Sequence, residues 1–296
     1  MTIRLDMRDR VFRAGDALGD SLDTVTAFLR RQLMPEGGFS GRDGRSDLYY
    51  TVFGLEASLA LGVDLPHGRI DAYLAGFAAG ESLDLVHLTS LIRCRANCGG
   101  AMDGRMRDGM ISHLLAYRSE DGGFNTAPGV SRGNAYGSFL TLGACQDLSL
   151  NLPDMGAVAQ SVCSLQMPDG GFSNEPTMAV SATPATAAAI CVLHYLKRPV
   201  PESAVRWLQD RASPRGGFTA IPLAGDLAIP DLLSTATALH SLSLVGALAD
   251  SEREKHLDYL DGLWSTQGGF RGHWGDEVVD CEYTYYGLLS LGCLAE

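Results

Sequence analysis

Two kinds of segment alternate along the chain, and they differ in how their charged residues are distributed. The first kind has apolar residues at three- and four-residue spacing with charges between them, as in "SLDTVTAFLRRQL" and "EREKHLDYLDGLW". The second kind carries almost no charge, as in "DLYYTVFGLEASLAL" and "TPATAAAICVLHYL". The first pattern predicts helices with one solvent-exposed face, and the second predicts helices that are buried on all sides. We call them outer and inner helices.

A glycine turn that ends in phenylalanine separates an outer helix from the inner helix that follows it. The turn occurs as "EGGF" at 36–39, "DGGF" at 121–124 and 169–172, "RGGF" at 215–218 and "QGGF" at 267–270. From the second turn to the last, neighbouring turns are 46 to 52 residues apart, whereas the first gap is 85 residues. This gap predicts one degenerate copy, and "IDAYLAGFAAGES" with "DLVHLTSLIRCRAN" fits it.

Helix pairs of this kind predict an all-α fold. We expect a closed α/α toroid (α/α barrel) of six helix-pair repeats, because closure removes the need for the polar capping repeats of an open solenoid. We expect residues 1–296 to form this single toroid domain, with residues 1–20 as an extension ahead of the first repeat.

Composition and charge narrow the class of protein. An apolar fraction of 46% in 296 residues supports a sizeable core, and the N-terminus has no apolar signal segment. No stretch reaches the apolar length of a membrane span, so we expect a cytoplasmic protein that does not span a membrane. The seven cysteines are typical of a reducing compartment. A net charge of −12 without a basic run argues against a nucleic-acid partner.

The residues around the turns carry a resemblance to a known family. "QLMPEGGF" (32–39) and "QMPDGGF" (166–172) are similar to the prenyltransferase and squalene oxidase repeat. That repeat is found in β subunits of protein prenyltransferases and in terpenoid cyclases of the squalene-hopene type. The resemblance implies an α/α toroid that acts on an isoprenoid or its diphosphate. It does not determine the reaction, because enzymes with different chemistry share the repeat.

For protein prenyltransferases the resemblance implies a catalytic zinc, bound by an Asp-x-Cys motif and by a His in a D-x-x-H-T setting. Here "VVDCEY" has Asp280 at the Asp position, Glu282 at the zinc-binding Cys and Tyr283 at the family's Tyr. "SDLYYT" has Tyr50 at the His. Zinc at such a site prefers thiolate or imidazole ligands, so we expect no zinc to bind. A diphosphate substrate would allow Mg²⁺ to bind with it. Since the first and last repeats of a ring are neighbours, we expect these four residues to cluster.

The resemblance also implies a diphosphate site, formed in the transferases by an Arg and a Lys in a G-R-x-x-K stretch. "GRDGRSD" in the first repeat has Arg42 and Arg45 in places that suit bidentate phosphate contacts. The alternative is that both are solvated loop arginines.

For the terpenoid cyclases the resemblance implies an acidic DxDD or DxDT motif, whose central Asp protonates an alkene or epoxide. "DCEYT" is the nearest match, with Glu282 as the candidate acid and Asp280 as its neighbour. Burial near another carboxylate raises the pKa of a carboxyl group and keeps it protonated. For Asp280 the alternative is a helix N-cap, a place that Asp47, Asp84 and Asp231 share.

Aromatic residues gather on the inner helices and predict an apolar central cavity, whose ring faces would stabilise a carbocation. For each single residue the alternative is core packing. The residues are Tyr49, Tyr50, Phe53, Tyr136, Phe139, Tyr283, Tyr285 and Tyr286.

Three functions stay open. The first is an isoprenoid-diphosphate-using enzyme that resembles a protein prenyltransferase β subunit but lacks its zinc ligands. In it Arg42 and Arg45 would bind the diphosphate, and Asp280, Glu282 and Tyr50 would line the reacting end. The second is a class II-type terpene cyclase with an Asp280/Glu282 acid. The third is a non-catalytic isoprenoid-binding or protein-interaction toroid. A partner subunit or a homodimer is compatible with each. The substrate-binding candidates beside the arginines are Tyr49, Phe53, Tyr136, Tyr283 and Tyr286.

Overall fold

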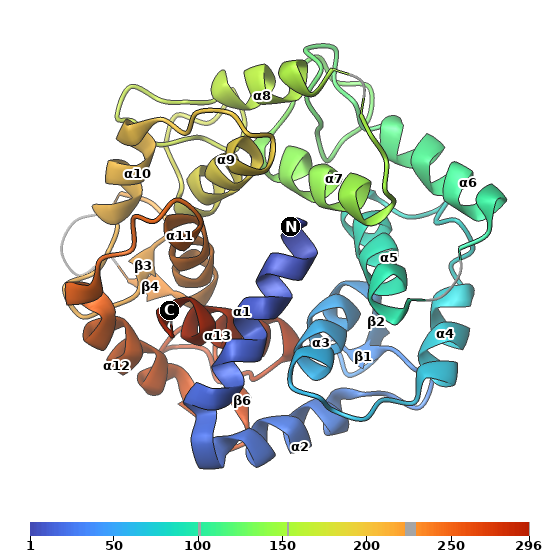
Figure 1. Cartoon of the computed structure of the whole chain (residues 1–296), viewed down its shortest axis with the longest axis vertical. Coiled ribbons are helices and arrows are strands. Elements are labelled where there is room, and N and C mark those ends of the chain that lie inside the picture. Colours follow the sequence, from blue (N-terminus) through green and yellow to red (C-terminus); the bar gives the residue numbers. More distant parts are fainter. Residues whose placement is uncertain (100–101, 153, 223–228, 296) are drawn as a thin grey trace. The chain divides into compact units, whose positions relative to one another are not determined.

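The computed structural model describes residues 1–99, 102–152, 154–222 and 229–295, and most of them are helical (Figure 1). The outer helices precede the turns, and they are α2 (Leu22–Gln32), α4 (His67–Ala75), α6 (Gly104–Leu115), α8 (Met155–Cys163), α10 (Glu202–Gln209) and α12 (Arg253–Leu263). The inner helices are α3 (Leu48–Ala60), α5 (Leu85–Cys98), α7 (Ala135–Asp147), α9 (Thr183–Tyr195), α11 (Leu232–Leu244) and α13 (Cys281–Leu294). The pair α4 and α5 confirms the helices predicted for the degenerate copy.

Short antiparallel strand pairs accompany several glycine turns. β1 (Phe39–Ser40) pairs with β2 (Ser46–Asp47), and β3 (Phe218–Thr219) pairs with β4 (Pro230–Asp231). Each of these pairs joins the Phe of the turn to the residue just before an inner helix. β5 (Trp264–Ser265) and β6 (Gly269–Phe270) instead enclose the last turn.

The chain forms two compact units. The first comprises Met1–Leu115, Gly143–Leu150 and Leu263–Glu296, so it contains both the first and the last glycine turn. The second comprises Ala116–Leu142 and Asn151–Gly262. A single domain over residues 1–296 stays a prediction.

The first glycine of each turn lets the chain pass close to the following outer helix. Gly216 and Gly268 have φ of 83° and 100°, a region that favours glycine. A Cβ atom on Gly216 would collide with the backbone carbonyl of Lys255 in α12, and one on Gly268 with that of Thr24 in α2. The second contact joins the last turn to the first outer helix within the first unit.

The phenylalanine of each turn is fastened to the next inner helix by the same hydrogen bond. Its backbone N–H donates to a Ser or Thr hydroxyl in the first turn or two of that helix. The acceptors are fully buried, so they satisfy amides that have no access to water. The pairs are Phe39 to Thr51 (2.9 Å), Phe124 to Ser138 (3.3 Å), Phe172 to Thr186 (2.9 Å), Phe218 to Thr235 (2.9 Å) and Phe270 to Thr284 (3.3 Å).

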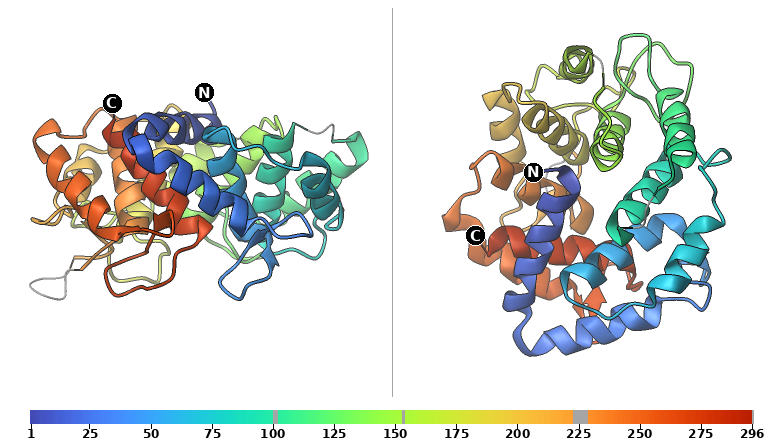
Figure 2. Two further views of the ribbon diagram at one scale, coloured as in Figure 1. Left: turned by 90° about the horizontal axis from the view of Figure 1, so that it is seen from below. Right: turned by 45° about the vertical axis from the view of Figure 1, so that its right-hand side comes forward.

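Residues 1–20, expected as an extension, form helix α1 (Ile3–Leu18), which packs against α13 and α3. The backbones of α1 and α13 nearly touch, because a Cβ atom on Gly292 would collide with the carbonyl of Arg10. In the first unit α1 lies at the end where the inner helices finish, opposite the β1–β2 loop (Figure 2, left).

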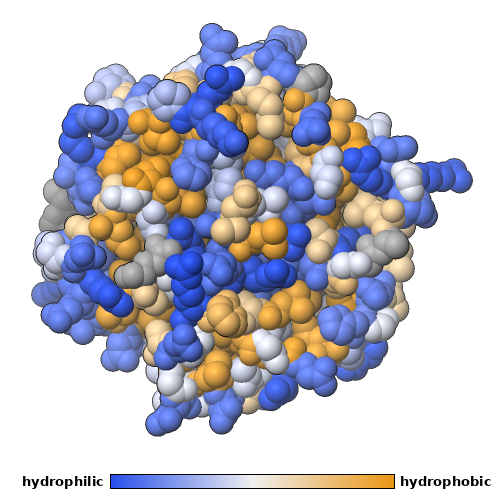
Figure 3. All heavy atoms as spheres, in the orientation of Figure 1, coloured by the Kyte–Doolittle hydropathy of each residue, from blue (hydrophilic) through white to orange (hydrophobic). Residues whose placement is uncertain are grey.

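Within the described residues, every helix is too short or too polar to cross a lipid bilayer. On the face drawn in Figure 3, hydrophobic residues lie in separate patches between hydrophilic ones.

Replacing Thr186 with Val is expected to lower the free energy of unfolding by about 1–3 kcal/mol, because the buried Phe172 N–H then has no acceptor while the side chain keeps its shape. Thr237→Val is the matched control, since the Thr237 hydroxyl donates only to carbonyls of its own helix. Its effect should stay within about 0.5 kcal/mol. Urea denaturation measures both variants, and equal losses would contradict the role given to the turn hydrogen bond.

Candidate functional site

The inner helices α3 and α13 begin beside one another in the first unit, and both are capped by an aspartate. The Asp47 side chain accepts a hydrogen bond from the Tyr50 N–H at 3.0 Å, and Asp280 accepts one from the Tyr283 N–H at 2.9 Å. Asp84 and Asp231 cap α5 and α11 in the same way. The N-cap interpretation is therefore correct for all four aspartates.

Arg42 connects the first repeat to the last. From the loop between β1 and β2, its Nε donates to Asp280 Oδ2 at 2.8 Å and its Nη2 to Asp276 Oδ2 at 2.9 Å. Its guanidinium also lies over the Tyr283 ring, 5.3 Å from the ring centre. One loop arginine thus holds two carboxylates more than 230 residues away in sequence.

The two carboxylates bound by Arg42 differ in their electrostatics. Asp280 is only 3% exposed, and burial raises its pKa although the Tyr283 N–H and Arg42 oppose the shift. Burial also acts on Asp276, but hydrogen bonds from the Val278 N–H and from Arg42 outweigh it and lower the pKa of Asp276.

Arg45 does not join this cluster. Its side chain is 85% exposed and pairs with Asp43, where Nε and Oδ2 are 3.0 Å apart. It matches the alternative of a solvated loop arginine, whereas Arg42 does not.

Glu282, in the first turn of α13, is bound by a tyrosine of α3. The Tyr49 hydroxyl of α3 donates to its Oε1 at 2.6 Å. Burial raises the pKa of Glu282; the Tyr49 hydrogen bond and Arg42 oppose this shift, and the charge of Asp280 adds to it. The result is a partly buried carboxyl group with a raised pKa and one oxygen held in place.

Tyr49, whose hydroxyl binds this carboxyl group, is part of a series of aromatic contacts between α3 and α13. Tyr49 makes edge contacts with Tyr50 and Phe53, at 5.6 and 5.0 Å between ring centres. Phe53 in turn contacts Tyr285 and Tyr286 of α13, at 5.6 and 5.4 Å. Carbocations are stabilised by such ring faces.

Two other predicted tyrosines have different places. Burial, together with the charges of Asp280 and Glu282, raises the pKa of Tyr50 to about 12, so its hydroxyl stays neutral beside the carboxyl pair. Tyr136 belongs to the second unit, where its N–H donates to Asn174 Oδ1. The structure therefore brings together the predicted site residues that belong to the first unit, with the exception of Arg45.

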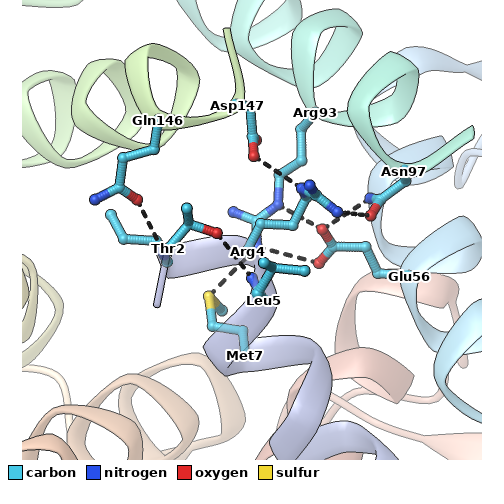
Figure 4. A network of polar contacts seen from close by, with 10 residues as sticks. Thr2, Arg4, Leu5, Met7, Glu56, Arg93, Asn97, Gln146 and Asp147 are labelled. Atoms are coloured by element: carbon cyan, nitrogen blue, oxygen red, sulfur yellow. Dashed lines mark hydrogen bonds and ion pairs between the residues drawn. The ribbon is translucent and has the colours of Figure 1, made fainter. Parts of the chain in front are cut away.

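A second polar cluster, which the sequence analysis missed, lies near the other end of α3 (Figure 4). Arg93 Nε of α5 donates to Glu56 Oε1 at 2.6 Å, and Asn97 Nδ2 donates to the same oxygen at 2.9 Å. Arg4 of α1 donates to Asn97 Oδ1 at 3.0 Å and to Asp147 Oδ1 at 2.8 Å. The sequence contains one sign of this cluster: Glu56 is a single charged residue in the otherwise apolar sequence of α3.

The residues at the family's zinc positions do not fit zinc. Glu282 and Tyr50 stand where a thiolate and an imidazole would bind, and Asp280 is held by Arg42. In the ranges that the structure describes, no three His, Cys, Asp or Glu side chains are grouped to hold a metal ion.

Buried inner helices, half-exposed outer helices and glycine turns with close backbone contacts define the class of α/α toroid domains. The chain belongs to the family of prenyltransferase alpha-alpha toroid domains, whose family model matches residues 82–228 and 232–296. This match confirms the predicted resemblance and the predicted fold class. No curated protein matches the chain.

Solved structures similar to this chain include enzymes of two kinds. The type II terpene cyclase MstE from Scytonema, in complex with its substrate geranylgeranyl dihydroxybenzoate, is 15% identical with a TM-score of 0.65, over 95% of this chain and 97% of that one. Candida albicans protein geranylgeranyltransferase-I, complexed with GGPP, is 15% identical with a TM-score of 0.68, over 91% and 90%. A protein from Actinoplanes is also 15% identical, with a TM-score of 0.62, over 93% and 98%. At these identities the likeness concerns the fold.

Arg42→Met is expected to lower the free energy of unfolding at neutral pH by about 1–3 kcal/mol, because it leaves the buried Asp280 carboxylate without its cation. The value lies below that of a fully buried pair, since the Arg42 side chain is itself 41% exposed. The loss should shrink as the pH falls through the raised pKa of Asp280, because a protonated carboxyl group needs no cation. Thermal and urea unfolding between pH 4 and 8 measure it.

Arg45→Met is the matched control from the same loop. Its exposed pair with Asp43 is screened by water, so the variant should show no measurable loss of stability at any of these pH values. If both variants lost equal stability, the separation of the two arginines would be refuted.

Proposed function

We propose that this chain is an acid-initiated cyclase of an isoprenoid, with Glu282 as the proton donor. The observation that carries the proposal is the Glu282–Tyr49 pair, in which a partly buried carboxyl group with a raised pKa is bound by a tyrosine that contacts further aromatic rings. Similarity of fold to a type II terpene cyclase supports the same class of reaction, at the level of the fold.

The geometry favours Glu282 over Asp280 as the acid. Both oxygens of Asp280 are engaged, Oδ1 by the Tyr283 N–H and Oδ2 by Arg42, and the ion pair favours the anion. For Glu282, Tyr49 holds Oε1, and no other described residue has a hydrogen bond to the carboxyl group, so we assign the transferable proton to Oε2. Two neighbouring carboxyl groups in different environments are the usual arrangement for separate acid and anion roles.

The proposed reaction is an isomerisation. The O–H bond of Glu282 breaks as the π electrons of an alkene take the proton, which leaves a carbocation on the substrate. A second double bond attacks this cation and closes a ring, while faces of Phe53 and Tyr286 stabilise the positive charge. The last cation loses a proton to water, which forms an alkene and hydronium, and a proton returns from the solvent to Glu282, so the product has the mass of the substrate.

The diphosphate-using transferase has less support from the geometry. Arg42 is already bound to two carboxylates, and Arg45 is exposed and paired with Asp43. A diphosphate at this place would meet the negative charges of Asp276 and Asp280, which repel it.

Glu282→Gln is expected to reduce cyclisation at least 100-fold, because general acid catalysis contributes about 10²–10⁴-fold. Purified protein is incubated with geranylgeraniol, geranylgeranyl diphosphate and geranylgeranyl dihydroxybenzoate, and mass spectrometry follows cyclic isomers of unchanged mass. Glu277→Gln, on the exposed part of the neighbouring loop, should retain full activity. Release of diphosphate without an isomer would support the transferase, and ligand-induced thermal stabilisation without turnover would support a binding protein.

The reaction should also depend on pH through Glu282. The protonated form is active, so the rate constant kcat falls as the pH rises through its raised pKa. The Tyr49 hydrogen bond lowers that pKa, so Tyr49→Phe should move the falling limb to higher pH. Tyr195→Phe in the second unit should leave the limb in place. A Tyr49→Phe profile that superimposes on the wild type would exclude Glu282 as the titrating acid.

A further inference from the structure

Basic side chains are rare on the inner helices. Five of these helices, α3, α7, α9, α11 and α13, contain neither Lys nor Arg, and α5 contains Arg93 and Arg95. Arg93 is paired, with its Nε 2.6 Å from Glu56 Oε1. Arg95 Nη2 donates to the Leu74 carbonyl at 2.9 Å. The inner helices all lie within the described ranges, and together they provide no free pair of cations for an anionic ligand.

The segments that join each glycine turn to its inner helix contain more acidic than basic residues. Arg42, Arg45 and Arg132 each pair with at least one carboxylate. Arg271 is the fourth arginine, and its Nε has no hydrogen-bond partner among the described residues. This excess of acidic residues disfavours a ligand with several negative charges. By sequence the segments contain four Arg, no Lys and eight Asp or Glu, in residues 39–47, 124–134, 172–182, 218–231 and 270–280.

Helix α1 brings four arginines to the opposite end of the first unit (Figure 2, left). Arg4, Arg10 and Arg13 each pair with a carboxylate, and Figure 4 shows the pair of Arg4. Arg8 is the fourth. Arg8 and Arg271 therefore belong to opposite ends of the first unit, one on α1 and the other just after the last glycine turn. Each of them is a single guanidinium and not part of a cationic cluster.

A diphosphate group needs several donors at one place. It carries several negative charges, and proteins bind such groups with clustered Arg or Lys, with helix N-termini or with Mg²⁺. Four inner-helix N-termini are already used, because the N-cap aspartates of α3, α5, α11 and α13 each accept an N–H of their own helix. A single arginine would leave most of the phosphate oxygens without a partner after they lose water, and this desolvation costs free energy.

We infer that the substrate of this protein is an isoprenoid without a diphosphate group. The inference rests on the proposed cyclase function and names its substrate class. An earlier reaction must then remove the diphosphate: the C1–O bond of an isoprenyl diphosphate breaks, the diphosphate leaves with the electron pair, and C1 forms a bond to an acceptor whose proton passes to the solvent. The acceptor is water, which gives an alcohol, or an aromatic ring, which gives a prenylated arene. Both products keep the alkene that Glu282 would protonate.

Ligand binding to the full chain tests the substrate class without requiring turnover. Geranylgeraniol, geranylgeranylhydroquinone and geranylgeranyl diphosphate share one tail and differ in the group at C1. Isothermal titration calorimetry gives their Kd values, with and without MgCl₂. We expect the diphosphate to bind at least about 100-fold more weakly than the better of the other two ligands, because its oxygens lose water without gaining cations. The better of those two ligands identifies the acceptor as water or as an aromatic ring.

Two matched variants test the remaining arginines. Arg8→Met and Arg271→Met each remove one guanidinium and keep an unbranched side chain at the position. Both variants should leave the three Kd values unchanged, because no phosphate contacts either arginine. Unfolding temperatures confirm that the variants are folded. Tight binding of the diphosphate to the wild type that is lost in one of the variants would identify a diphosphate site and would overturn the inference.

The outcomes separate the substrate class from the proposed reaction. Cyclic isomers formed from geranylgeranyl diphosphate with the same kcat/KM as from the other two ligands would overturn the inference and leave the cyclase function intact. Selective binding of the alcohol or the arene without any isomer would contradict the cyclase function and support the ligand class. Equal affinity for all three ligands, with or without MgCl₂, or no binding of any of them, would overturn the inference.

Discussion

The hydrogen bond from the Phe N–H of a glycine turn to a Ser or Thr hydroxyl is the contact on which the rest of this structure depends. The Phe amide is buried, and a buried amide without a partner would cost about as much as the hydrogen bond itself contributes. The hydroxyl on the inner helix therefore determines where that helix starts relative to the turn. In the first repeat Thr51 also donates to the Asp47 carbonyl, which joins the turn, the N-cap and the helix in one unit.

The candidate site follows from this constraint at two neighbouring helix starts. Thr51 and Thr284 hold the first turns of α3 and α13 against Phe39 and Phe270. With α13 so placed, its cap residue Asp280 faces Arg42, and Glu282, two positions later, faces Tyr49 of α3. A spacing of two residues separates side chains on a helix, so one short motif supplies an ion-paired carboxylate and a second carboxyl group in a different environment.

Periodicity predicted the helix pairs and the degenerate copy, and the shared position of four aspartates ahead of inner helices indicated the N-caps as an alternative to catalysis. Each of these depends on residues close together in sequence. Three other features could not be predicted. Arg42 and Arg45 look equivalent in "GRDGRSD", and only the path of the loop sends one to Asp280 and the other into solvent. The turn hydroxyls lie 12 to 17 residues beyond their Phe, so variable loop lengths hide them. The Glu56–Arg93 pair joins two inner helices, and no local pattern indicates such a contact.

The N-termini of α3 and α13 bear on the choice between an acid and a diphosphate site. Uncapped helix N-termini bind phosphate groups well, because their N–H groups and dipoles favour negative charge. Here Asp47 and Asp280 each already accept one of those N–H groups, and Arg42 is bound to Asp280 and Asp276. The positive ends of these two helix dipoles therefore bind carboxylates of the protein itself. The α13 dipole and Tyr49 also stabilise the Glu282 anion, and burial alone would make Glu282 too weak an acid to protonate an alkene. Burial keeps the proton in place, and these two interactions make it easier to transfer.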